Sequence, residues 1–176
     1  MLTLRPPLPQ DEQPLRRLHA QLAAEDFELL LAEGDWAQIL AQVAREASGT
    51  DLPPGRVRAE FLVAEVDGTP VGRVSIRYAL TPFLLEVGGH VGYAVGPDHR
   101  RRGHATEILR QSVQRLADAG VDRVLVTCDD DNAASATVIE RCGGVLEDVR
   151  ERPGDGPAKR RYWISPRAAR ERAASR

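Results

Sequence analysis

The sequence predicts an α+β domain with α/β-like crossovers, built on a mixed β-sheet. Short segments rich in β-branched residues recur in the second half of the chain, at residues 90–95, 121–128 and 145–149. A helical pattern follows each of the first two segments, as in units whose helices cross over a sheet. Earlier in the chain, Asp67-Gly68 is a hairpin signal between two apolar segments, which adds antiparallel strands.

Before this hairpin the pattern predicts one strand and then helices. Residues 2–5 alternate apolar and polar side chains and end at prolines, as expected of a strand. Asp11 is expected to cap a first helix, residues 27–31 to form a second helical stretch, and Asp35 to cap the next helix. The apolar stripes of the two capped helices are Leu15, Leu18, Leu22 and Ala23, and Trp36, Ile39, Leu40 and Val43.

The remaining elements complete a sheet of six to seven strands with about four helices. The hairpin strands are expected at residues 61–66 and 71–79. Gly103 opens a helix that ends at Gly120, and a short helix is expected at residues 133–142. Residues 161–164 read as a last strand. Residues 1–165 are therefore expected to form one domain, and residues 166–176 a solvated basic tail.

Composition excludes several classes of protein. The net charge is -2 and the sequence pI about 6.1, which disfavours nucleic-acid binding. No apolar run is long enough to cross a membrane, and the first residues do not resemble a secretory signal, so a cytoplasmic protein is expected. Cys128 and Cys142 form no CxxC pair and lack a histidine cluster, so neither a disulfide scaffold nor a metal site is predicted.

The most informative stretch is VGPDHRRRGHAT at residues 95–106. A strand ends, a basic turn with one glycine follows, and an amphipathic helix begins. The N-terminus of a helix carries unpaired N–H groups and the positive end of the helix dipole, and together these attract anions. Gly103 and the small Ala105 allow a ligand to approach the backbone closely. The stretch therefore predicts a phosphate or diphosphate site.

The alternative is that the three arginines are only a solvated charge cluster. Cations are unfavourable at the N-terminus of a helix, so three of them there favour a bound anion. Two other phosphate motifs are absent, because the chain has no GxxxxGK[ST] and residues 88–92 do not make GxGxxG. P-loop and dinucleotide-binding interpretations are therefore excluded.

The segment Arg100-x-x-Gly103-x-Ala105 resembles the Q/R-x-x-G-x-G/A signature of the GCN5-related N-acetyltransferases, the GNAT superfamily. Residues 132–135 (NAAS) resemble the family's N-x-x-S segment, and residues 140–144 (ERCGG) its E-K-x-G-F helix ending, with Gly144 in place of phenylalanine. The resemblance spans about residues 59–164 and is similar to that of uncharacterised predicted acetyltransferases. It implies the GNAT fold, in which the fourth and fifth strands splay apart around the cofactor.

The resemblance also implies acetyl-CoA as co-substrate, with no metal. The fourth strand would pair with the pantetheine arm, the backbone of the basic turn would hold the diphosphate, and the N-x-x-S residues would lie near the sulfur. These cofactor-binding residues are Tyr93, Ala94, Val95, Arg100, Arg101, Arg102, Gly103, His104, Ala105, Thr106, Asn132 and Ser135.

Acetyl transfer to an amine benefits from a base that removes the amine proton, and an acid that protonates the leaving thiolate. Glu86 is the first candidate base, because its apolar neighbours favour a raised pKa, and His90 is the second. Four residues apart in an extended strand, the two would share one face. Ile139 stands where many family members have a tyrosine that acts as the general acid. Tyr162, Tyr93, Ser135 or water is therefore left as the proton donor.

The acceptor is expected to be a small-molecule or peptide amine, attacked directly in a ternary complex. Glu25, Asp26 and Glu28 favour a cationic acceptor. A non-catalytic acyl-CoA-binding sensor on the same fold is the alternative, motivated by Ile139. Relatives are often dimers, so the resemblance is compatible with a homodimer.

Overall fold

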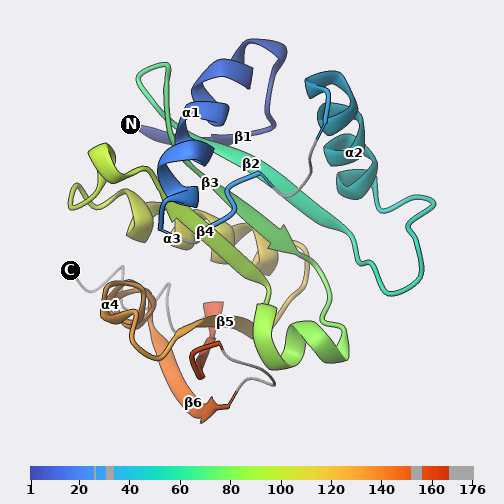
Figure 1. Ribbon diagram of the computed structural model, residues 1–176. Helices are drawn as coiled ribbons and strands as arrows, with labels where there is room; N and C mark the ends of the chain where they lie inside the picture. The colour runs from blue at the N-terminus through green and yellow to red at the C-terminus, as the bar shows by residue number, and fades with distance from the viewer. Residues whose placement is uncertain (26, 31–33, 152–155, 167–176) are drawn as a thin grey trace. The chain divides into compact units, whose positions relative to one another are not determined.

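The computed structural model describes residues 1–25, 27–30, 34–151 and 156–166. Within them, seven strands form one mixed sheet in the order β1-β2-β3-β4-β5-β7-β6, with four α-helices (Figure 1). The strands are β1 (Leu2–Arg5), β2 (Ala59–Val66), β3 (Thr69–Arg77), β4 (Val91–Val95), β5 (Val124–Asp129), β6 (Gly144–Arg150) and β7 (Lys159–Ile164). The helices are α1 (Glu12–Ala23), α2 (Trp36–Ser48), α3 (His104–Asp118) and α4 (Ala133–Arg141). The predicted α+β class is confirmed.

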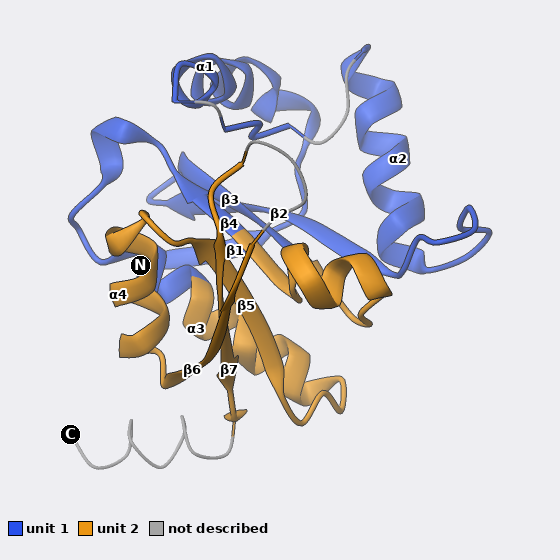
Figure 2. Ribbon diagram, turned by 60° about the horizontal axis from the view of Figure 1, so that its bottom comes forward, with its two compact units in different colours: residues 1–75, 93–108 blue, residues 76–92, 109–176 orange. Residues whose placement is uncertain are grey.

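The chain divides into two compact units (Figure 2). Unit 1 comprises Met1–Ser75 and Tyr93–Ile108, and unit 2 comprises Ile76–Gly92 and Leu109–Arg176. The boundaries fall inside β3, β4 and α3, so these three elements each contribute residues to both units. A single domain over residues 1–165 stays a prediction, and the predicted tail lies outside the described residues from residue 167 on.

Unit 1 is built on the predicted hairpin. Asp67 and Gly68 join β2 to β3 with φ values of 48° and 80°, the left-handed pair that a tight two-residue turn requires. β1 pairs antiparallel with β2, in a register that places Leu2 opposite Val66. The core of the unit gathers the predicted leucines of α1 and the first turn of α2 against β2: Leu15, Leu18, Leu22, Leu29, Leu30, Trp36, Ile39, Phe61 and Val63.

One local prediction for unit 1 is wrong, and a second is confirmed in position only. Residues 27–30 are not helical, and the main-chain carbonyls of Glu28 and Leu29 accept hydrogen bonds from the buried Arg73. Leu31 lies outside the described residues. Asp11 is the N-cap residue of α1, as predicted, but its side chain makes no capping bond, since its carboxylate accepts from the Leu8 N–H and from Arg5.

A glycine allows β3 to lie close to β4. A Cβ atom at Gly72 would lie 2.2 Å from the carbonyl oxygen of Ala94, closer than any real contact. Immediately afterwards, the N–H of Gly96 donates to the carbonyl of Val71 at 2.9 Å. Gly72 therefore determines where the end of β4 lies, and with it the start of the basic turn.

Unit 2 contains the parallel pair that the fold requires. β4 pairs parallel with β5, with Val91 opposite Val126 in the register, and β7 lies antiparallel between β5 and β6. Separation of β4 from β5 beyond this point stays a prediction. The apolar positions predicted for α3 are buried at Ile108, Leu109, Val113 and Leu116. Among the helices of the described residues, none combines the length and apolarity needed to cross a bilayer.

Candidate functional site

The predicted anion site is a turn between β4 and α3 in unit 1. β4 ends at Val95, a 3-10 turn follows over Pro97–His99, and α3 starts at His104. Within the 100–105 turn, Arg101 and Gly103 have positive φ values of 60° and 81°. The left-handed conformation is costly for an arginine, and such strain is typically found at functional sites.

The turn presents main-chain donors. None of the N–H groups of residues 101–105 donates a hydrogen bond to another described residue. Turns with left-handed residues gather successive N–H groups on one side, where they bind anions, and the N-terminus of α3 adds the positive end of its dipole. A Cβ atom built on Gly103 would meet nothing within 4 Å, so the space beside the turn is open. The turn therefore fits a diphosphate.

The charges around the turn are positive. Arg101 and Arg102 are exposed, and neither is paired with an acidic side chain of the described residues. Burial, followed by the charges of Arg102 and His99, lowers the pKa of His104 below its usual value. Cations crowded together in this way are stabilised by an anion, which agrees with the phosphate interpretation.

Arg100 differs from this prediction. Its guanidinium turns toward the end of α1, where Nη1 and Nη2 donate to the two carboxylate oxygens of Glu25 at 3.1 and 2.6 Å, and Nε donates to the Val95 carbonyl at 3.3 Å. This pairing lowers the pKa of Glu25. The charge of Arg100 is therefore paired with Glu25 in this structure, and its contribution to the anion site stays a prediction. No local signal could reveal a partner 75 residues away.

Of the acidic residues expected to attract a cationic acceptor, Glu25 already has a cationic partner in this structure. The carboxylate of Glu25 accepts from Arg100, whereas the side chain of Glu28 is exposed and only its main-chain carbonyl accepts from Arg73, so the role of Glu28 toward an acceptor stays a prediction. Asp26 lies outside the described residues.

Asn132 and Ser135 meet at the start of α4 in unit 2. The Asn132 Oδ1 accepts from the Ser135 N–H at 2.9 Å, which caps the helix. The Ser135 side chain is hydrogen-bonded to the buried Cys128 thiol. Burial raises the pKa of this thiol. Both residues thus help to begin α4, and their contact with a cofactor stays a prediction.

His90 is a buried residue that joins the beginning of β4 to β5. Its ring Nδ1 accepts from the Leu125 N–H at 2.9 Å, and its main-chain N–H donates to the Leu125 carbonyl at 2.8 Å. Burial and the charge of Arg77 lower the pKa of His90 to about 4, so the ring is neutral at pH 7. A ring with one nitrogen occupied and so low a pKa is a weak base.

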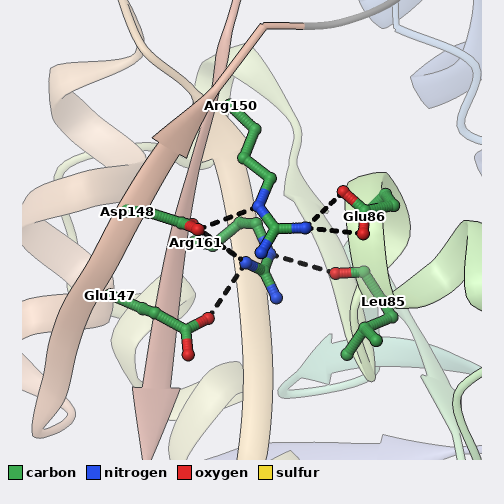
Figure 3. Close-up of polar contacts among 6 residues, drawn as sticks. All are labelled: Leu85, Glu86, Glu147, Asp148, Arg150 and Arg161. Carbon is green, nitrogen blue, oxygen red and sulfur yellow. Dashed lines mark hydrogen bonds and ion pairs between the residues drawn. The ribbon is translucent and has the colours of Figure 1, made fainter.

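Glu86 and His90 do not lie on one extended strand, the arrangement in which they would share a face. It lies in a π-helical turn, η2 (Leu84–Gly88), and Gly89 with φ 61° separates this turn from the strand. Both of its carboxylate oxygens accept from Nη1 of Arg150 on β6, at 2.5 Å (Figure 3). Sixty-four residues separate these partners, so sequence reasoning missed Arg150.

Two arginines, Arg150 on β6 and Arg161 on β7, fix the η2 turn to these strands. Arg161, almost fully buried on β7, donates to the Leu85 carbonyl at 3.0 Å and pairs with Glu147 and Asp148 (Figure 3). Arg150 also pairs with Asp148 at 2.8 Å. Because the turn is fixed at Leu85, the exposed carboxylate of Glu86 has a defined position.

Tyr162 is buried on β7, and its hydroxyl donates to Glu140 on α4 at 3.1 Å. Burial raises the pKa of Tyr162, so the phenol stays protonated well above neutral pH. The hydroxyl therefore carries its proton at neutral pH, and this proton makes the hydrogen bond to Glu140.

Among the described residues, no group of three or more His, Cys, Asp or Glu side chains is arranged to hold a metal ion.

The chain matches the model of the acetyltransferase (GNAT) domain over residues 1–145. It belongs to the GNAT acetyltransferase family. The match includes the hairpin, β4 and the 100–105 turn, and so confirms the family inferred from the signature. A comparison with curated proteins found no match.

Solved structures share the GNAT fold at low identity. RimJ of Mycobacterium smegmatis, in complex with CoA-disulfide, has a TM-score of 0.75 and 20% identity over 99% of this chain and 88% of its own. The microcin C7 self-immunity acetyltransferase MccE, in complex with acetyl-CoA and AMP, has a TM-score of 0.69 and 18% identity over 93% and 92%. The spermidine/spermine N-acetyltransferase SpeG of Vibrio cholerae has a TM-score of 0.67 and 15% identity over 98% and 99%.

Proposed function

We propose that this GNAT acetyltransferase transfers the acetyl group of acetyl-CoA to a primary amine by direct attack in a ternary complex. The observation that carries the proposal is the 100–105 turn, with unpaired main-chain donors, open space beside Gly103 and two unpaired arginines within the described residues. These features suit the diphosphate of coenzyme A. Relatives of the same fold are described in complex with acetyl-CoA and with CoA-disulfide, which supports this choice of ligand.

Acetyl-CoA supplies an activated acyl group as a thioester. The amine nitrogen forms a bond to the acyl carbon, the carbon–sulfur bond breaks, and the proton lost by the amine ends on the departing thiolate. In this proposal the N–H groups of residues 101–105 hold the diphosphate, and the strand residues Tyr93, Ala94 and Val95 hold the pantetheine arm.

Glu86 is the proposed base. Its carboxylate is exposed on a turn fixed by Arg161, whereas the ring of His90 is buried and bound by Leu125. A carboxylate paired with an exposed arginine can exchange that partner for the ammonium of an acceptor, since exposed ion pairs are weak. His90 then has a structural role. The proton donor stays open among Tyr162, Tyr93, Ser135 and water, because the Tyr162 hydroxyl is buried and donates to Glu140.

Substituting Glu86 and Arg150 one at a time distinguishes a catalytic role of Glu86 from a purely structural role of its ion pair. Glu86→Gln is expected to lower kcat about 100-fold, because it removes a general base. Arg150→Gln breaks the same ion pair, leaves the carboxylate in place, and is expected to retain most of the activity. Steady-state rates with a fixed amine measure both variants. Equal losses in the two would assign Glu86 to structure alone.

The proposed reaction is tested by coenzyme A thiol release from acetyl-CoA in the presence of single amines. The panel contains spermidine, because a relative of this fold is named for that acceptor, and a short peptide with a free N-terminus. Mass spectrometry should detect the acetylated amine in step with thiol release. Acetyl-CoA binding without transfer to any amine of the panel would favour the alternative, a non-catalytic acyl-CoA sensor.

A further inference from the structure

The chain from Gly96 to Arg100 lies against one face of α1 and its extension. Glu25 lies two residues beyond α1, and its N–H donates to the Leu22 carbonyl at 2.9 Å, which continues the helical turn. Side chains three and four residues apart share a helical face. Three such side chains meet the chain in order: Leu18 meets Gly96, Gln21 meets Asp98, and Glu25 meets Arg100.

These contacts fix the entrance to the 100–105 turn. A Cβ atom at Gly96 would lie 2.4 Å from Cδ2 of Leu18, so any larger residue would require the Leu18 side chain to shift. The Gln21 Nε2 donates to Asp98 at 3.1 Å. Arg100 then makes the last contact through both Nη atoms, in the two-bond geometry that gives arginine–carboxylate pairs their directionality.

We infer that Glu25 is a positioning residue for the 100–105 turn: it holds the Arg100 side chain against α1, so that the main-chain N–H groups of residues 101–105 face the diphosphate. The inference rests on the proposed function. With its Nε on the Val95 carbonyl and its Nη atoms on Glu25, the guanidinium is fixed between the end of β4 and the end of α1. Without Glu25 the guanidinium is free to move into the turn.

Loss of the Glu25 charge and loss of its positioning role have opposite expected effects on acetyl-CoA affinity in Glu25→Gln. The substitution removes a negative charge near an anion site, so electrostatic attraction alone would make acetyl-CoA bind more tightly. Loss of positioning makes acetyl-CoA bind more weakly, because the turn must then be ordered on binding. The sign of the change therefore decides between the two effects.

Glu12→Gln is the matched control. Glu12 lies on the same helix and pairs with Arg16 at 2.9 Å, so this variant loses the same charge and an exposed ion pair without touching the turn. In calorimetric titrations with acetyl-CoA, Glu25→Gln is expected to bind about two- to fivefold more weakly than the native protein, the upper range for an exposed pair. Glu12→Gln should bind like the native protein. Unchanged or tighter binding by Glu25→Gln overturns the inference.

Hydrogen exchange in the free protein provides a readout that does not depend on acetyl-CoA. The N–H groups of His99 and Arg100 donate to Gly96 and Pro97, and they should exchange faster in Glu25→Gln than in the native protein or in Glu12→Gln. Equal exchange in all three proteins overturns the inference whatever the affinities. If the native protein fails to bind acetyl-CoA, the proposed function fails, and the exchange rates alone decide the role of Glu25.

Discussion

Replacing Gly103 with glutamate is expected to weaken acetyl-CoA binding by at least about 100-fold. The Cβ of the new side chain would enter open space beside the 100–105 turn, and its carboxylate would face the N–H groups assigned to the diphosphate. Bulk and negative charge would then occupy the anion site together. A 100-fold loss corresponds to about 2.7 kcal/mol, which is reasonable for a like charge placed against a bound phosphate.

The other end of α3 supplies the control for this variant. Gly120 has φ 86°, compared with 81° at Gly103, and a Cβ there also meets nothing within 4 Å. Gly120→Glu therefore carries similar backbone strain and the same charge, away from the turn. Calorimetric titration of both variants, after thermal unfolding has shown that they are folded, measures the difference. If both bind acetyl-CoA like the native protein, the turn does not hold the diphosphate.

The second large effect concerns His90 and pH. Burial lowers its pKa from 6.5 to about 4 in the folded protein, so between these values the unfolded chain binds a proton that the native state does not. The stability associated with the neutral ring is fully present above pH 6.5 and is lost as pH falls toward 4. The loss amounts to at most about 3 kcal/mol.

His90→Asn is the variant that isolates this effect. Its Oδ1 can accept the Leu125 N–H at the place of the histidine Nδ1, while the titrating group is removed. Urea unfolding between pH 4 and pH 7.5 should show a smaller decline in the free energy of unfolding than the native protein shows. Parallel curves for the two proteins would mean that His90 is not buried as a neutral ring. His90→Ala should cost about 1–3 kcal/mol at neutral pH, because the Leu125 N–H loses its acceptor.

Local signals in the sequence were sufficient for much of the fold. Asp35 caps α2 through the Ala37 N–H, Asp67 and Gly68 form the hairpin turn, and Gly103 precedes α3, as the pattern predicted. In each case the physical cause lies within a few residues of the effect, so one short stretch contains the whole signal.

The failures involve partners that are distant in sequence. Residues 27–30 are apolar enough for a helix, but Arg73 on β3 takes their carbonyls. Glu86 and His90 would share a face only on an extended strand, but Glu86 lies in a helical turn that Arg161 fixes from 76 residues away. Propensity could not anticipate these contacts, because long-range pairing overrides it.

The candidate site divides in the same way. The sequence predicted a turn with Gly103 at the start of α3, but not the left-handed conformation of Arg101. The orientation of the Arg100 side chain depends on Glu25, which the sequence offered only as an acidic residue for a cationic acceptor.

A crystal structure of the protein with acetyl-CoA tests the central claim most directly. The account predicts that the diphosphate oxygens accept hydrogen bonds from main-chain N–H groups of residues 101–105, with the Arg100 guanidinium still on Glu25. A diphosphate bound elsewhere, with these N–H groups facing solvent, would contradict it.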